Sequence, residues 1–270
     1  MPTAIASTST GVVVGPWRAA LLAFENHWVW YRRNWRATVI SSFLQPVLFL
    51  LAMGIGFGSQ VQPGEATGGL RYAVYLAPAL LVNTAVQNTA WESTFAVFSS
   101  FKWTKIYHAV VATPITPAQM LHGQLLWITA RVFASGLAFV LVAALLGAVG
   151  GWGFLLALPF SVLAGMAFCA PVIAFTATRE KPDAFNGLFR FVLMPMTLFA
   201  GTFFPVDQLP EIVRPLIWLT PVWHGVELAR GAAFGTWSLL PALGHVAYLT
   251  AMLLVGVVLA RKYFQRRLAV

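Results

Sequence analysis

The residues best placed to do chemistry within apolar sequence are Glu92 and Arg131. They lie in consecutive runs, residues 72–99 and residues 119–149, that are each long enough to cross a bilayer. At about 1.5 Å per residue, Glu92 would lie roughly 10 Å and Arg131 roughly 18 Å from the same membrane face. A charge in lipid costs at least a few kcal/mol unless it is paired or wetted. The two charges therefore indicate either a pathway wall or gating pair, or a structural pair that locks two helices together.

The run 72–99 also carries a stripe of polar side chains. Thr84, Asn88 and Glu92 are four residues apart, which places them on one face of a helix. Such a face would line a polar cavity or the seam between two copies of the chain. Alternatively, it would form hydrogen bonds to a neighbouring helix, each contributing less than about 2 kcal/mol. The concentration of polarity in a single run favours the cavity or seam.

No motif in the sequence is typical of a catalytic or metal centre. The five histidines do not form H-E-x-x-H and do not lie at zinc-ligand spacing with the single cysteine, Cys169. The nucleophile motif G-x-S-x-G is absent, and no lysine stands in a G-x-x-x-x-G-K-[ST] phosphate loop. The sequence therefore predicts a chain that is not an enzyme and binds no cofactor. If ATP drives it, another chain binds the ATP and its Mg²⁺.

Composition indicates that lipid surrounds most of the chain. Of the 270 residues, 59% are hydrophobic and 9% are charged, and the mean hydropathy is +0.76. A soluble domain is about a quarter charged. The net charge of +9 comes from short basic clusters between apolar runs, with no separate basic domain. This pattern is typical of membrane loops, so nucleic acid is not expected as a partner.

Six apolar runs have the length of membrane-spanning helices. They cover residues 38–57, 72–99, 119–149, 154–177, 185–203 and 239–259. Twelve lysines and arginines flank the runs on one side, whereas only three, Arg71, Arg214 and Arg230, lie on the other. The positive-inside rule then places both termini in the cytoplasm. The expected fold is an all-α membrane protein with six transmembrane helices.

The transmembrane domain is expected to cover residues 37–260, and the segments outside it are short. Residues 1–15 are expected to be disordered, and residues 261–270 form an expected basic cytoplasmic tail. Residues 16–36 carry an apolar, mostly aromatic stripe at helical spacing together with several arginines. This combination predicts an amphipathic helix in the headgroup plane; the alternative is a soluble helix packed on a partner domain.

Two connections between the predicted spans have patterns of their own. Residues 101–118 are too polar to span and predict a short cytoplasmic helix with Phe101 and Ile106 on its apolar side, ended by Pro114. Residues 204–238 hold two apolar stretches, 212–219 and 222–234, that are separated by prolines and are too short to cross a bilayer. They predict two external re-entrant or interfacial half-helices between spans five and six.

This organisation resembles the permeases of the ABC-2 type transporter family. Residues 112–115 (A-T-P-I) are similar to the family's T-P turn before span three. Residues 199–210 (F-A-G-T-F-F-P-V-D-Q-L-P) resemble the S-G-x-x-F-P-x-x-x-L-P end of span five, and residues 221–230 (P-V-W-H-G-V-E-L-A-R) continue the similarity. The resemblance is greatest to the NodJ- and DrrB-like branch of lipo-oligosaccharide and drug exporter permeases.

The resemblance implies a permease subunit of an ATP-driven exporter in the inner membrane of a bacterium. A second permease copy, a separate ABC ATP-binding subunit and membrane lipid are the implied partners. The short cytoplasmic helix would be the coupling helix that docks on the ATP-binding subunit, through Phe101, Lys102, Trp103, Lys105, Ile106 and Val110. The candidates for the pathway or gate are Asn88, Glu92, Arg131, Glu227 and Arg230; the last two, at i and i+3, could equally be an exposed surface pair.

The implied substrate is hydrophobic or amphipathic: a lipid-linked saccharide, a glycolipid or a drug. Two other functions remain open at this point. A proton-coupled secondary transporter would use Glu92 as its titrating carboxylate. An intramembrane enzyme or lipid transferase would turn over substrate without a partner, although the sequence offers no catalytic motif for it.

Overall fold

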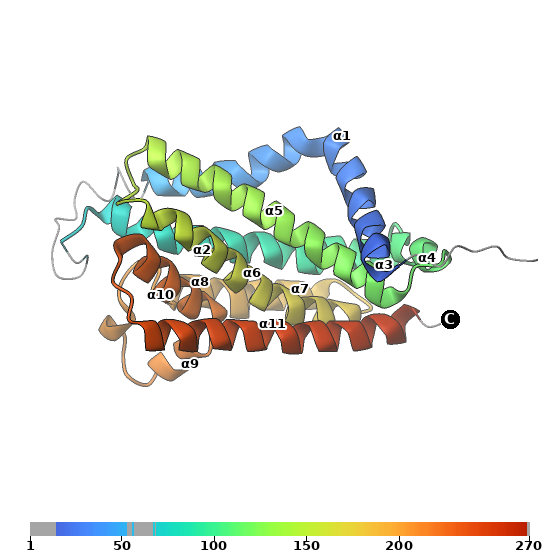
Figure 1. Cartoon of the computed structure of the whole chain (residues 1–270). Coiled ribbons are helices and arrows are strands. Elements are labelled where there is room, and N and C mark those ends of the chain that lie inside the picture. The colour runs from blue at the N-terminus through green and yellow to red at the C-terminus, as the bar shows by residue number, and fades with distance from the viewer. Residues whose placement is uncertain (1–14, 53–55, 57–66, 68, 269–270) are drawn as a thin grey trace, which may run out of the picture.

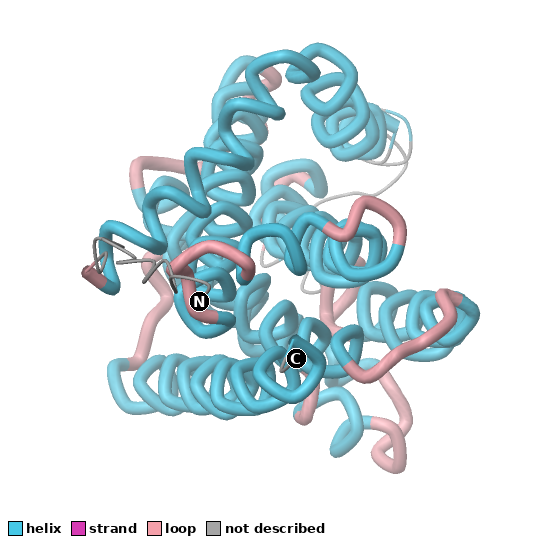
Figure 2. Tube along the Cα trace, turned by 90° about the vertical axis from the view of Figure 1, so that its right-hand side faces the viewer, coloured by secondary structure: helices cyan, strands magenta, loops and turns pink. Residues whose placement is uncertain are grey.

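The computed structural model describes residues 15–52, 56, 67 and 69–268. This part of the chain is helical and contains no strand. Its long helices run side by side in an elongated bundle (Figure 1), and Figure 2 views the bundle from the end where α3, α4 and the end of α11 lie. We call this end the hairpin end, and we call the end that holds α9, α10 and the start of α11 the opposite end.

The helices are α1 (Pro16–Leu51), α2 (Tyr72–Trp91), α3 (Val97–Lys102), α4 (Ile106–Val111), α5 (Pro117–Leu145), α6 (Gly153–Ala177), α7 (Asp183–Leu188), α8 (Met194–Phe199), α9 (Arg214–Trp218), α10 (Pro221–Phe234) and α11 (Leu239–Leu268). A π-helical turn, η4 (Glu92–Ala96), joins α2 to α3, and a second, η5 (Phe189–Leu193), joins α7 to α8. A short 3₁₀ turn, η6 (Val206–Gln208), precedes α9.

Helix α6 is the centre of the bundle. In its most apolar stretch 72% of residues are buried within the chain, against 33% in α5 and 11% in α11. These three helices are the ones in the described part that are long and apolar enough to cross a membrane. Because α5 and α11 leave most of their apolar side chains uncovered, lipid is the solvent that suits their outer faces.

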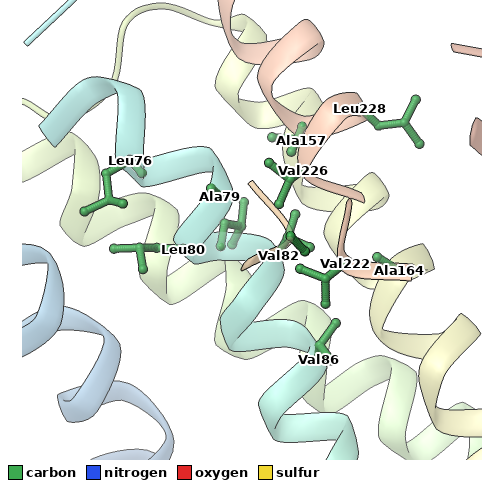
Figure 3. Close-up of a cluster of buried hydrophobic side chains, with 14 of the residues drawn as sticks. Leu76, Ala79, Leu80, Val82, Val86, Ala157, Ala164, Val222, Val226 and Leu228 are labelled. Carbon is green, nitrogen blue, oxygen red and sulfur yellow. The ribbon is translucent and has the colours of Figure 1, made fainter. Parts of the chain in front are cut away.

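Small residues bring the neighbouring helices very close to α6. A Cβ atom on Gly225 of α10 would lie 2.6 Å from Cβ of Ala164, and one on Gly256 of α11 would lie 2.4 Å from Cδ of Pro171. Neither position has room for a larger side chain. Around the α10 contact, apolar side chains from α2, α6 and α10 fill the core (Figure 3), among them Val82 and Val226, which are fully buried.

The helix boundaries agree with the predicted spans in the third, fourth and sixth runs, which correspond to α5, α6 and α11. The second run corresponds to α2, η4 and α3 in continuous succession, and the fifth to α7, η5 and α8, which end at Phe199. Both predicted half-helices form, as α9 and α10. Six membrane crossings and a re-entrant course of α9 and α10 stay predictions.

The N-terminal helix and the first predicted span are joined in one element. Helix α1 is continuous from Pro16 to Leu51, and Figure 1 shows it as two arms separated by a bend, the first near the hairpin end and the second along the bundle. The predicted disordered residues 1–14 and the end of the first span lie outside the described residues. The predicted C-terminal tail continues α11 as helix up to Leu268.

Candidate functional site

The predicted coupling segment is a helical hairpin. Helix α3 ends where the carbonyl of Ser99 accepts hydrogen bonds from the N–H groups of Trp103 and Thr104, both at 2.9 Å. The chain then reverses through Lys105, whose φ of 53° is the left-handed conformation that non-glycine residues rarely adopt. The prediction of one helix from Phe101 to Val111 was wrong in this respect, because the reversal separates Phe101 on α3 from α4.

Buried aromatic rings anchor this hairpin. Phe101 is 1% exposed, and its ring centroid lies 4.8 Å from that of Tyr107 on α4 and 4.8 Å from that of Phe264 on α11. The Tyr107 hydroxyl donates a hydrogen bond of 3.0 Å to Oε1 of Gln124 on α5. Phe101 is therefore part of the core, and the surface available for a partner consists of other residues.

The exposed surface of the hairpin mixes apolar and basic side chains. Trp103 is 61% exposed and Ile106 is 38% exposed, and Lys102 and Lys105 lie beside them, whereas Val110 is half-buried. Helix α5 follows after a capping box, in which the N–H of Gln119 donates to Thr116 and the N–H of Thr116 donates to the Gln119 side chain. The start of α5 is thus fixed, and the hairpin projects from it as a short rigid unit.

A second set of contacts ties the hairpin to α6 and α11. Lys102 forms an ion pair with Glu180, in the turn after α6, and Glu180 also lies 3.5 Å from Nη2 of Arg267 on α11. Nη1 of Arg267 donates to the carbonyls of Thr176 and Ala177 at 3.1 and 2.9 Å, and its guanidinium lies 4.5 Å from the Phe101 ring centroid. Arg267 thereby caps the C-terminal end of α6 while it covers the anchor of the hairpin.

These charges also set the protonation of the Glu180 carboxyl. The hydrogen bond from Lys102 lowers the pKa of Glu180 below its ordinary value, and the positive charge of Arg267 lowers it further. Glu180 is exposed, so bulk solvent screens part of this interaction. At neutral pH the carboxyl is ionised and links the two cations.

Glu92 and Arg131 meet inside the bundle. Nη1 of Arg131 on α5 donates to Oε1 of Glu92 at the start of η4, and the two side chains are 20% and 11% exposed. The guanidinium also lies 5.6 Å from the ring centroid of Tyr31 on α1. One turn earlier, Nδ2 of Asn88 donates to Oγ of Ser135 on α5 at 3.0 Å. Asn88 and Glu92 thus form hydrogen bonds between helices. This is the second of the two roles considered for the polar stripe, hydrogen bonding to a neighbouring helix.

At the opposite end, Glu227 and Arg230 are one turn apart on α10. The three ion pairs of the described residues lie elsewhere, so these two side chains do not pair. The guanidinium of Arg230 instead lies 4.0 Å above the ring centroid of Tyr75, and its Nη2 donates to the carbonyl of Thr202 at 2.9 Å. Glu227 is exposed.

Sequence reasoning missed a histidine pair at the same end. Nδ1 of His224 on α10 lies 2.7 Å from Nδ1 of His245 on α11, and Nε2 of His224 lies 2.8 Å from the carbonyl of Trp218. The Tyr248 ring stacks on His224 with a centroid distance of 4.0 Å. The only signal in the sequence is that His245 and Tyr248 are three residues apart, on one face of a helix.

Comparison with known proteins decides the family. The sequence profile described as ABC-2 type transporter matches residues 20–234, which is most of the chain. The chain belongs to the ABC-2 type transporter family. The resemblance of the chain to this family is thereby confirmed.

Several curated relatives of this ABC-2 chain share the name nodulation protein J. The protein of Sinorhizobium fredii (strain NBRC 101917 / NGR234) is 30% identical over 264 residues, which cover 93% of this chain and 98% of the relative. The protein of Rhizobium meliloti (strain 1021) is 27% identical over 264 residues, which cover 93% of this chain and 99% of the relative. The protein of Rhizobium leguminosarum bv. viciae is 25% identical over 248 residues, which cover 92% of this chain and 94% of the relative.

Family membership and the apolar helices identify the ABC-2 chain as a multi-pass membrane protein. It is a transport permease and not the catalytic subunit of its transporter. Membership also implies partnership with an ABC ATP-binding subunit.

Proposed function

We propose that this chain is the membrane permease of an ATP-driven exporter and that the exposed surface of the α3–α4 hairpin docks on the ATP-binding subunit. The observation that carries the proposal is the construction of the hairpin. Trp103 and Ile106 are exposed for contact, while Phe101 and Tyr107 are buried as anchors. An exposed aromatic residue beside cations is typical of an interface anchor.

The arrangement of charges supports a cytoplasmic position for the hairpin end. Lys102 ends α3, Lys105 lies between α3 and α4, and Arg179 and Lys181 lie in the turn after α6. The end of α11 (Figure 1) adds Arg261, Lys262, Arg266 and Arg267. Arg71 and Arg214 belong to the opposite end. With six crossings, the positive-inside rule places both termini in the cytoplasm, and α9 and α10 enter the outer leaflet as half-helices.

In this mechanism the hairpin transmits movement as a rigid body. Closure of the ATP-binding subunits around ATP and Mg²⁺ pushes on Trp103 and Ile106. The rings of Phe101, Tyr107 and Phe264 contact one another edge to face or tilted within a close-packed core, so the push passes through them into α11. The driving energy is the preference of ATP for the closed state of the partner.

The proposal includes two copies of the permease in a bacterial inner membrane, with a hydrophobic or amphipathic substrate leaving outward. Helix α8 and the π-turn before it expose large apolar side chains, including Phe191 and Met194, to lipid or to the second copy. The ion pair of Glu92 and Arg131 gives no support to a proton-coupled mechanism, because the carboxylate is already held by a permanent cation.

The test is co-purification with ATP-binding subunits of the source organism, expressed with the permease one at a time and reconstituted in lipid nanodiscs. Trp103→Asp and Ile106→Asp place a charge on the exposed docking surface and leave the buried anchor unchanged. We expect each to abolish association and permease-dependent ATP hydrolysis. The matched control is Trp152→Asp, because Trp152 is 88% exposed on the loop between α5 and α6.

Unchanged association of Trp103→Asp and Ile106→Asp would overturn the docking surface. Transport by the permease without any ATP-binding subunit, abolished by a proton uncoupler and by Glu92→Gln, would replace the whole proposal with a secondary transporter. Substrate turnover by the purified permease alone would instead indicate an enzyme.

A further inference from the structure

The histidine pair at the opposite end joins two separate parts of the chain. His224 lies in the first turn of α10, and His245 lies in α11. Tyr248, one turn further along α11, donates a hydrogen bond of 2.6 Å to the carbonyl of Leu219. His224 is 9% exposed, and the ring centroid of Trp223 lies 4.8 Å from that of His224 and 5.0 Å from that of His245. The pair and Tyr248 therefore fasten the turn between α9 and α10 onto α11, in largely buried surroundings.

The hydrogen bonds determine which ring nitrogens carry protons. Nε2 of His224 lies 2.8 Å from the carbonyl of Trp218, which can only accept, so this nitrogen carries a proton. In the neutral ring, Nδ1 of His224 is then a bare acceptor. Nδ1 of His245, at 2.7 Å, must donate to it. A single proton thus lies between the two Nδ1 atoms, and Nε2 of His245 is bare.

This arrangement tolerates one added proton but not two. The first added proton charges one ring and still leaves a single proton between the two Nδ1 atoms, so the hydrogen bond persists. The second places an N–H group on both Nδ1 atoms and a positive charge on both rings. Two donors without an acceptor and two like charges repel each other strongly at this distance in a buried site. The doubly charged pair therefore cannot keep the contact between His224 and His245.

The number of bound protons gives the direction of the pH dependence. Once the two rings are apart, each can take its second proton independently, and a histidine in water does so near its ordinary pKa of about 6.5. The separated state thus binds more protons than the paired state. A fall in pH therefore favours separation, and a rise favours pairing.

The charged and titratable side chains around the pair do not supply a counter-ion. His245 lines a hollow of about 530 Å³ between the start of α2, α10 and the start of α11. Neither imidazole forms an ion pair with a carboxylate within the described residues. The charged or titratable residues on the elements around the pair are Tyr75 on α2, Cys169 on α6, Arg214 on α9, Glu227 and Arg230 on α10, and Tyr248 on α11. Glu227 is the one carboxylate among them, and its charge is opposed by that of Arg230, which lines the same hollow.

We propose that His224 and His245 form an acid-sensitive latch, which holds α9 and the first turn of α10 on α11 and opens when both imidazoles are charged. The remainder of α10 stays in place, because Gly225 packs directly against Ala164 of α6. In the orientation proposed above the latch lies on the external side, so the protons come from the external medium. Only this last point rests on the proposed function, since the latch itself requires no ATP-binding subunit.

The test uses the purified full-length chain in lipid nanodiscs, without an ATP-binding subunit. Solid-state NMR of the chain labelled with ¹⁵N-histidine detects the coupling between the two Nδ1 nitrogens across their hydrogen bond. We expect this coupling at about pH 8 and its loss at about pH 4, on either side of the range in which histidine ordinarily titrates.

The movement of α9 is measured by pulsed electron paramagnetic resonance between two spin labels. The label sites are Leu216→Cys on α9 and Leu240→Cys on α11, which are 68% and 82% exposed, whereas the native Cys169 is fully buried. We expect the distance between the labels to lengthen and its distribution to broaden at about pH 4, and both changes to reverse at about pH 8.

His245→Asn separates titration from structure. The Asn amide nitrogen stands where Nδ1 stands in histidine and can donate to His224, but it takes up no proton in this range. We therefore expect the labels in this variant to stay close at both pH values. His245→Ala removes the donor and should give the long distance at both. The matched control is His122→Asn, because His122 is exposed on α5 at the hairpin end and should leave the acid response unchanged.

Absence of the coupling at pH 8, or label distances that are equal at pH 8 and pH 4 in the chain with both histidines, would overturn the inference. An acid response of the same size in His245→Asn would assign it to another group and overturn the latch as well. The coupling is measured in the unsubstituted chain, so it decides the question even if a variant fails to fold. None of these results bears on docking to the ATP-binding subunit, so failure of the latch is distinguishable from failure of the proposed function.

Discussion

At the hairpin end, Arg267 and Glu180 are held by carbonyl groups, by a lysine and by each other, over a core of packed aromatic rings. At the opposite end, Glu227 and Arg230 stand one turn apart on α10 without an ion pair between them, beside a hollow. A paired charge fixes one structure, whereas an unused charge is free to meet a ligand. The contrast separates a packed end whose charges are paired from an end whose two charges form no ion pair within the described residues.

The largest effect is expected from Phe264→Ala, which removes the ring that joins the hairpin to α11. Phe264 is fully buried, and deletion of a buried phenylalanine ring typically costs about 3–5 kcal/mol. We expect a lower unfolding temperature in detergent and a loss of permease-dependent ATP hydrolysis. Leu254→Ala, on the exposed face of the same helix, is the control. Equal unfolding temperatures for the two variants would contradict the view of this end as a packed connector.

Glu92→Gln should have the next largest effect, because it leaves the Arg131 guanidinium without its counter-ion. Stripping one partner from a buried pair costs about 3 kcal/mol or more, whereas Glu227→Gln at the opposite end should stay within about 0.5 kcal/mol. The double variant Glu92→Gln/Arg131→Gln should recover most of the loss. Denaturant unfolding of the unsubstituted chain, Glu92→Gln, Arg131→Gln and the double variant measures the coupling energy of the pair. If the double variant is stable but transport is lost, the pair belongs to the pathway.

Arg267→Gln should lower stability by about 2 kcal/mol, since it removes two charge-assisted hydrogen bonds to the end of α6. The more diagnostic readout is the number of ATP molecules hydrolysed per substrate exported, which we expect to rise. Arg267→Lys keeps the charge but not the planar set of donors, so it should bring the number of ATP molecules hydrolysed per substrate exported only part of the way back. An unchanged ratio in Arg267→Gln would assign Arg267 to stability alone.

The smallest effect is a pH dependence that arises at Glu180. The pKa of Glu180 is lowered in the folded state, so the ion pair makes its full contribution to the free energy of unfolding above pH 4.5, the ordinary pKa of this carboxyl. That contribution is lost as the pH falls through the lower folded-state pKa. Thermal unfolding between pH 6 and pH 3 should show a decline that is weaker in Glu180→Gln. Identical pH profiles would show that solvent screens the pair completely.

Much of the fold follows from apolar run length, because lipid requires each span to satisfy its own backbone. The runs at 119–149, 154–177 and 239–259 therefore predicted α5, α6 and α11 well. The cost of a charge in lipid predicted that Glu92 and Arg131 would be either paired or wetted, and the structure shows that they pair. Run length gives no signal for the reversal at Lys105, which depends on two hydrogen bonds to the Ser99 carbonyl.

The anchors of the candidate sites were harder to predict. The segment 261–270 reads as a basic tail, and nothing local indicates that Phe264 within it is fully buried. The stacking of Arg230 on Tyr75 joins residues far apart in the sequence, and periodicity within one helix cannot report such a contact. The i, i+3 spacing of Glu227 and Arg230 left a surface pair open beside a role in the gate, but the Tyr75 ring and the Thr202 carbonyl hold the guanidinium instead.

The close contacts at Gly225 and Gly256 have a mechanical consequence. Because Ala164 and Pro171 of α6 fill the space beside Gly225 and Gly256, a side chain at either glycine would push α10 or α11 away from α6. Helices α6, α10 and α11 are therefore closely packed on one another. The segment α7–η5–α8 packs on the rest of the chain through longer side chains such as Phe185 and carries a π-turn at its midpoint. We therefore expect the hinge of the transport cycle in that segment, with the closely packed helices α6, α10 and α11 moving together.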